Sequence, residues 1–162
     1  MGALDGIRIL DLSRILAGPW ATQMLSDLGA DVVKVEADWG DDTRKWGPPF
    51  IEDDAAYFHA CNRGKRSMIL DIKSDDGIEL LRRMIDCADV VVENFRTGTL
   101  EKLGLSSEIF EGKILCRITG YGQTGPRASE PGYDIALQAM TGIMSVTGTA
   151  DGEPAKVGVA WI

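Results

Sequence analysis

The 162-residue chain is poor in the residues that build metal centres and disulfide frameworks. It has one histidine, His59, and three widely separated cysteines, Cys61, Cys87 and Cys116. A single histidine argues against a histidine-rich metal site and against a Ser-His-Asp triad. Three cysteines without a CxxC spacing predict neither a zinc site nor a set of disulfides. We therefore expect no metal and a reducing compartment: the cytoplasm or, in a eukaryotic source, the mitochondrial matrix or a peroxisome.

Long apolar runs and excess positive charge are also missing. No stretch of 18 or more apolar residues occurs, so we expect no membrane-spanning helix. The chain has 17 Lys and Arg against 25 Asp and Glu, a net charge of -8, which repels nucleic acids and anionic membranes. Because charges are screened beyond roughly 8–10 Å at physiological salt, an anionic ligand needs a local basic cluster.

The chain does contain an alternation of strand and helix patterns. Apolar runs predict strands at residues 7–12, 31–36, 67–72, 89–92 and 113–119. Helical spacing and end signals predict helices at residues 19–28, around 57–59, 75–87, 99–103 and from 134 onward. This alternation predicts an α/β fold, a doubly wound parallel sheet of Rossmann-like type with helices on both faces.

In such open sheets, ligands bind at the carboxyl ends of the strands. Loops that begin at Ser13, Glu36, Glu93 and Gly120 are therefore candidate sites. Residues 120–125 (GYGQTG) match GxGxxG, but the prolines that follow predict an irregular loop instead of the helix that a dinucleotide fingerprint requires. This loop is better interpreted as a ligand loop lined by backbone.

Two further segments have a structural and a functional interpretation. Residues 62–67 (NRGKRS) are the densest basic cluster in this acidic chain. They form either a solvated turn or a phosphate site, since Arg forks and a Lys point charge suit phosphates. Residues 40–50 are rich in aromatic and proline residues, and they predict either a lid over a pocket that includes Trp46 or a packed surface loop.

Five motifs, in this order, are similar to those of the class III coenzyme A transferase family, which includes formyl-CoA and carnitine CoA-transferases. They are residues 11–19 (DLSRILAGP), 28–36 (LGADVVKVE), 62–67 (NRGKRS), 92–95 (VENF) and 120–126 (GYGQTGP). The resemblance covers essentially the whole chain. Residues 40–50 look most like members that move CoA between short dicarboxylates such as succinate and glutarate.

The resemblance implies a transferase that moves CoA from an acyl-CoA donor to a carboxylic acid through an aspartyl-CoA intermediate. It also implies an interlocked homodimer, and it makes residues 1–162 the N-terminal, CoA-binding portion of a large α/β domain. The basic cluster and the resemblance together give the expected CoA contacts: Arg14, Ile15, Leu16, Ala17, Asn62, Arg63, Lys65, Arg66, Leu70, Asp71, Ile72, Lys73, Asn94, Phe95, Arg96, Lys102, Gly132 and Tyr133. Trp46 corresponds to a tryptophan of the acyl pocket. Ala37 departs from members that have an arginine there, and alanine lacks the guanidinium that would contact a phosphate.

The family's nucleophilic aspartate follows the segment that corresponds to residues 156–162 (KVGVAWI). We therefore expect the nucleophile directly beyond Ile162, an incomplete fold at the C-terminus, and no transferase activity from these 162 residues alone. Two alternatives stay open. One is a relative of α-methylacyl-CoA racemase, which has a histidine where this chain has Tyr133, and the other is a non-catalytic CoA-binding module.

Overall fold

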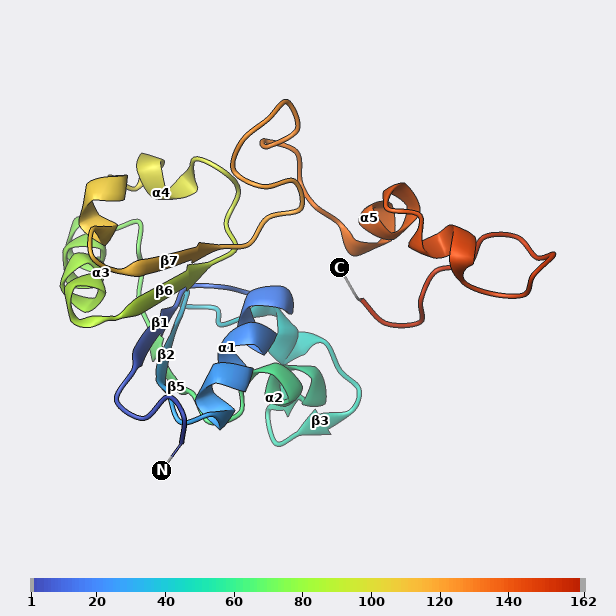
Figure 1. Cartoon of the computed structure of the whole chain (residues 1–162). Helices are drawn as coiled ribbons and strands as arrows, with labels where there is room; N and C mark the ends of the chain where they lie inside the picture. Colours follow the sequence, from blue (N-terminus) through green and yellow to red (C-terminus); the bar gives the residue numbers. More distant parts are fainter. Residues whose placement is uncertain (1, 161–162) are drawn as a thin grey trace. The chain divides into compact units, whose positions relative to one another are not determined.

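The centre of the fold is a parallel sheet of five strands, seen in a computed structural model that describes residues 2–160 (Figure 1). The strands are β1 (Arg8–Asp11), β2 (Asp31–Glu36), β5 (Arg66–Ile69), β6 (Val90–Glu93) and β7 (Ile114–Arg117). Their order in the sheet is β5-β2-β1-β6-β7. The chain thus changes direction across the sheet between β1 and β6, and the predicted doubly wound sheet is confirmed.

Helices cover both faces of this sheet. α1 (Ala17–Asp27) and α2 (Ala56–Asn62) pack side by side, whereas α3 (Asp75–Cys87), α4 (Thr99–Lys102) and the 3-10 helix η2 (Ser107–Phe110) follow the later strands. Successive strand side chains point to opposite faces. Accordingly, Leu10 joins the core cluster that contains Leu81 of α3, and its neighbour Ile9 joins the cluster around Val32.

The start of α3 fixes the segment that follows β5. The Ser74 hydroxyl caps the helix by accepting from the Gly77 N–H at 3.1 Å. Gly77 lies so close to this segment that a Cβ on it would be 1.9 Å from the Asp71 carbonyl oxygen. Only glycine permits this approach, so α3 packs directly against the backbone at the carboxyl end of β5.

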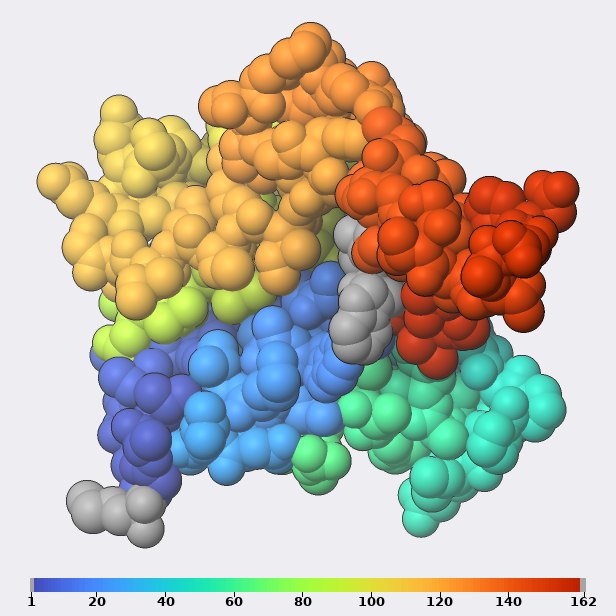
Figure 2. Space-filling view, turned by 45° about the vertical axis from the view of Figure 1, so that its right-hand side comes forward, coloured from blue at the N-terminus to red at the C-terminus, as the bar shows by residue number. Residues whose placement is uncertain are grey.

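A folded connection joins β2 to β5. It consists of the 3-10 helix η1 (Asp42–Lys45), the short antiparallel strands β3 (Phe50–Ile51) and β4 (Asp54–Ala55), and α2. In the space-filling view, the turquoise residues of this connection form an outer surface near the blue α1 (Figure 2). The predicted loop at residues 40–50 is therefore partly ordered into η1.

The chain divides into two compact units, residues 1–118 with the sheet and residues 119–162. The second unit contains α5 (Asp134–Met140) and the 3-10 helix η3 (Ile143–Val146). Residues 120–133 contain no helix, as predicted. Of the apolar segment 156–162, residues 156–160 have no strand or helix, and Trp161 and Ile162 lie outside the described residues. That both units belong to one large domain stays a prediction.

Leu81 offers a direct test of the core. Its side chain is fully buried, whereas that of its neighbour Leu80 is 37% exposed. Leu81→Ala should lower the free energy of unfolding by about 2–5 kcal/mol because it removes buried methyl groups and leaves a cavity. Leu80→Ala is the matched control and should have a much smaller effect in urea unfolding. Equal effects would contradict the assignment of Leu81 to the core.

Candidate functional site

A cleft of about 400 Å³ lies at the carboxyl ends of β1, β2 and β5. The residues after these strands form its walls, together with the loop after β6 and one side of α4. Much of the lining is apolar: Leu12, Val35, Leu70, Ile72, Phe95 and Leu103. Charged side chains also line it: Arg14, Lys34, Glu36, Asp38, Asp41, Asp71 and Lys73. The apolar part of the lining suits a ring, and the exposed cations Arg14 and Lys73 suit anionic groups.

The cleft brings together six of the predicted CoA contacts, from three separate parts of the sequence. They are Arg14, Leu70, Asp71, Ile72, Lys73 and Phe95. The Lys73 side chain has no ion pair among residues 2–160, while Arg14 pairs with Asp42 at the surface. Lys73 is therefore the cleft cation that is most available to an anionic ligand.

Asn94 connects the loop after β6 to the loop after β1. Its side-chain oxygen accepts from the Arg14 N–H at 2.8 Å, and its side-chain nitrogen donates to the Arg14 carbonyl at 2.7 Å. This two-way contact fixes the Arg14 backbone at the point where the strand order reverses. Ile15, Leu16 and Ala17 continue from it into the start of α1.

The predicted basic cluster lies outside the cleft and has other partners. The Lys65 side chain is buried, and its ammonium donates to Asp11 at 2.9 Å, to the Pro19 carbonyl at 2.8 Å and to Asn62 at 2.9 Å. Burial lowers the pKa of Lys65, and Asp11 opposes that shift. Arg63 and Arg66 form ion pairs with Asp27 and Asp31. The four predicted contacts Asn62, Arg63, Lys65 and Arg66 are thus engaged in structural interactions, which sequence reasoning did not anticipate.

The remaining predicted residues do not line this cleft either. Trp46 is half-exposed and meets Tyr57 edge to face, with ring centroids 5.5 Å apart. Arg96 and Lys102 are exposed. Gly132 and Tyr133 belong to the second unit, where a Cβ on Gly120 would lie 2.4 Å from the Gly132 Cα. Their roles stay predictions.

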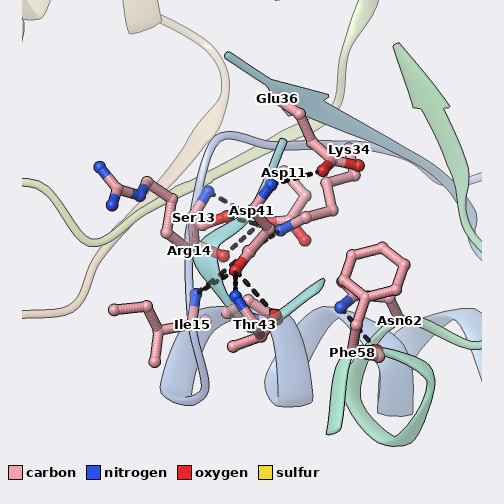
Figure 3. A network of polar contacts seen from close by, with 12 residues as sticks. Asp11, Ser13, Arg14, Ile15, Lys34, Glu36, Asp41, Thr43, Phe58 and Asn62 are labelled. Atoms are coloured by element: carbon pink, nitrogen blue, oxygen red, sulfur yellow. Dashed lines mark hydrogen bonds and ion pairs between the residues drawn. The ribbon is translucent and has the colours of Figure 1, made fainter. Parts of the chain in front are cut away.

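Sequence reasoning missed the buried ion pair between Lys34 and Asp41. Lys34 is 1% exposed and Asp41 is 2% exposed, and their charged groups lie 2.9 Å apart (Figure 3). Lys34 also donates to the Ser13 carbonyl at 2.8 Å. A signal was present: Lys34 interrupts an apolar strand in the middle of a sheet covered on both faces, where a charge must be paired.

Glu36 forms a second buried contact beside this pair. It accepts from Arg44 at 2.6 and 2.8 Å, from the Ser67 hydroxyl at 2.5 Å and from the Asp41 N–H at 2.7 Å. Burial alone would raise the pKa of Glu36, but these donors hold it below its usual range. For Asp41, burial likewise acts upward, and the charge of Lys34 with the donors of Thr43 lowers the pKa overall.

A family model described as CoA-transferase family III matches residues 4–162. The chain belongs to this family. The family that the five motifs predicted is therefore confirmed.

Among individual relatives, the chain is similar to succinate–glutarate CoA-transferase of Agrobacterium fabrum, with 54% identity over 97% of this chain and 42% of that protein. Human succinyl-CoA:glutarate CoA-transferase is 46% identical over 97% of this chain and 37% of that protein. A CaiB/BaiF family protein from Brucella suis has a crystal structure that superposes with a TM-score of 0.93 at 56% identity, covering 98% of this chain and 44% of that one. The chain thus spans about two fifths of the length of the curated relatives that it matches.

Between residues 2 and 160, no group of three or more His, Cys, Asp or Glu side chains could hold a metal ion. In the same residues, no helix is long and apolar enough to cross a membrane.

The lowered pKa values of Glu36 and Asp41 predict loss of stability in acid. Because both values lie below those of the unfolded chain, near pH 4, the folded state binds fewer protons in that range. Their stabilising contribution is complete above about pH 4 and is lost as the pH falls through the folded values.

Urea unfolding between pH 3 and pH 6 measures this effect. Asp41→Asn should flatten the acid dependence, and Asp53→Asn controls for the loss of one exposed charge. An unchanged slope for Asp41→Asn, in a protein that still folds, would contradict the role assigned to this carboxylate.

Proposed function

We propose that this chain supplies the CoA-binding part of a CoA transferase that acts on short dicarboxylic acids. The observation on which this rests is the apolar cleft at the carboxyl ends of the strands, where Lys73 and the Arg14 loop meet residues 70–72. The names of the relatives support the substrate class, since two of them are succinate–glutarate transferases. We propose acyl-CoA and a small carboxylic acid as its ligands.

The cleft provides suitable surroundings for the nucleotide end of CoA. Phe95 and Ile72 offer apolar contact to a ring, and Trp39 lies at the same cleft. Lys73 and Arg14 lie at its walls and would pair with phosphate groups, with Arg96 and Lys102 as further exposed cations in the neighbouring loop and helix. Because Asn62, Arg63, Lys65 and Arg66 are engaged elsewhere, we leave them out of the proposed site.

We infer the covalent chemistry from the resemblance to the family. An aspartate carboxylate attacks the thioester carbonyl and releases CoA thiolate, which leaves a mixed anhydride. The thiolate then attacks the aspartyl carbonyl, releases the donor acid and forms an aspartyl-CoA thioester. The acceptor carboxylate attacks this thioester and releases CoA thiolate, which leaves a second mixed anhydride. The thiolate attacks the acceptor's carbonyl in that anhydride, which gives the new acyl-CoA and frees the aspartate. We propose that this aspartate directly follows Ile162, that Trp46 and Tyr133 contribute to the site, and that the protein is an interlocked homodimer.

Lys73→Ala should weaken binding of CoA by about 1–3 kcal/mol, because it removes a charged hydrogen bond to a phosphate. Isothermal calorimetry with CoA and with 3′-dephospho-CoA measures the loss and assigns the phosphate. Arg66→Ala is the matched control, since Arg66 is exposed, paired with Asp31 and outside the cleft. A larger loss for Arg66→Ala would instead favour the basic cluster as the phosphate site.

Transfer itself is tested with succinyl-CoA and glutarate, following thioester products by chromatography. We expect turnover from the full-length protein and none from residues 1–162 alone, because loss of a covalent nucleophile commonly lowers rates by several powers of ten. Enzymatic turnover by residues 1–162, or an acyl adduct on Asp134 or Asp151, would place the nucleophile within this chain. Racemisation without transfer would favour the racemase alternative.

A further inference from the structure

The loop between β1 and α1 contains an unusual backbone conformation. Ile15 has a φ of 70°, in the left-handed region that β-branched residues very rarely occupy. Such a conformation persists only when the surroundings hold it, and it is enriched where a protein binds or transforms a ligand. The same loop contains Arg14, which lines the cleft.

Asp41, which also lines the cleft, holds this conformation by accepting from the Ile15 N–H. Its Oδ2 atom accepts from the Ile15 N–H at 3.1 Å and pairs with Lys34 at 2.9 Å. Its Oδ1 atom accepts from the N–H and the hydroxyl of Thr43, at 3.0 and 2.8 Å. In Figure 3, Asp41 lies between Ile15 and Thr43, and the Arg14 side chain extends away from this network.

The residues before Ile15 are held in the same way. The Ser13 carbonyl accepts from Lys34, and both backbone groups of Arg14 bind Asn94. Side chains from β2, from the cap of η1 and from the loop after β6 therefore fix three consecutive residues. A turn held so completely has little conformational freedom left to lose when a ligand binds, which favours affinity.

We propose that Asp41, paired with Lys34, is a positioning residue that holds Ile15 in its left-handed conformation and so presents residues 14–17 to CoA in a preformed shape. This inference rests on the proposed function. Asp41 touches no ligand in this proposal and acts only through the loop. The 3-10 helix η1 shares the same carboxylate, so the loop that leads to Trp46 is anchored at the same point.

The test compares Asp41→Asn with Thr43→Val in the full-length protein. The Asp41 carboxylate uses both of its oxygens to accept hydrogen bonds. An asparagine side chain has only one acceptor oxygen, and its NH2 group would face the Lys34 ammonium. We expect the dissociation constant of CoA and the KM for succinyl-CoA to rise on the order of tenfold. Thr43→Val removes only the hydroxyl contact, so it should lower the melting temperature without changing the dissociation constant.

A second pair of variants gives a result even where Asp41→Asn does not fold. Ile15→Ala and Ile15→Gly both remove the side chain, but only glycine relieves the left-handed strain and frees the backbone. Ile15→Gly should be at least as stable as Ile15→Ala and yet bind CoA more weakly. If the conformation of Ile15 had only a structural role, the stability of the two variants and their affinity for CoA would change in parallel.

Calorimetry with CoA separates the outcomes. Wild-type affinity in folded Asp41→Asn, or equal affinity in the two Ile15 variants, would overturn this inference alone. If the unaltered protein bound no CoA, the proposed function would fail and this inference with it.

Discussion

Two buried ion pairs at the carboxyl ends of β1 and β2 determine the shape of the candidate site. Asp11 pairs with Lys65, and Lys34 pairs with Asp41, all four side chains being nearly inaccessible to solvent. Breaking a buried pair by removing one partner costs about 3–5 kcal/mol, because the other charge stays buried and unpaired. The two pairs join the β1–α1 turn to η1 and to the segment that follows α2. The geometry of the turn therefore depends on residues distant in sequence.

Local patterns predicted the elements well because the elements depend on local interactions. β2 and α3 have the predicted bounds: β2 has a run of valines, and α3 has a serine cap followed by acidic residues. The ion pairs could not be predicted in this way. Lys65 and Asp11 are 54 positions apart, and they meet because β5 and β1 both pair with β2 and because α2 packs against α1. Asn94 and Arg14 likewise meet because β6 pairs with β1.

The basic cluster shows that a high local density of positive charge need not leave any cation unpaired. In an acidic chain, a basic side chain readily finds a carboxylate nearby, as Arg63 does with Asp27 and Arg66 with Asp31. Lys73, which the family resemblance gave as a CoA contact, follows the carboxyl end of β5 and lines the cleft. A cation without a carboxylate partner is the better candidate for a phosphate, since it need not give up an existing ion pair.

The same network bears on the covalent step that we propose. Glu36 and Asp41 are the buried carboxylates of the cleft, and each is surrounded by donors that engage its oxygen atoms. Donors that lower a carboxylate's pKa also lower its nucleophilicity, and a lone pair bound to Lys34 or Arg44 is not free to attack a thioester. The carboxylates of Glu36 and Asp41 therefore stabilise the walls of the cleft. A nucleophile for acyl transfer needs a free oxygen, so Glu36 and Asp41 are poor candidates for the covalent step of the proposed mechanism.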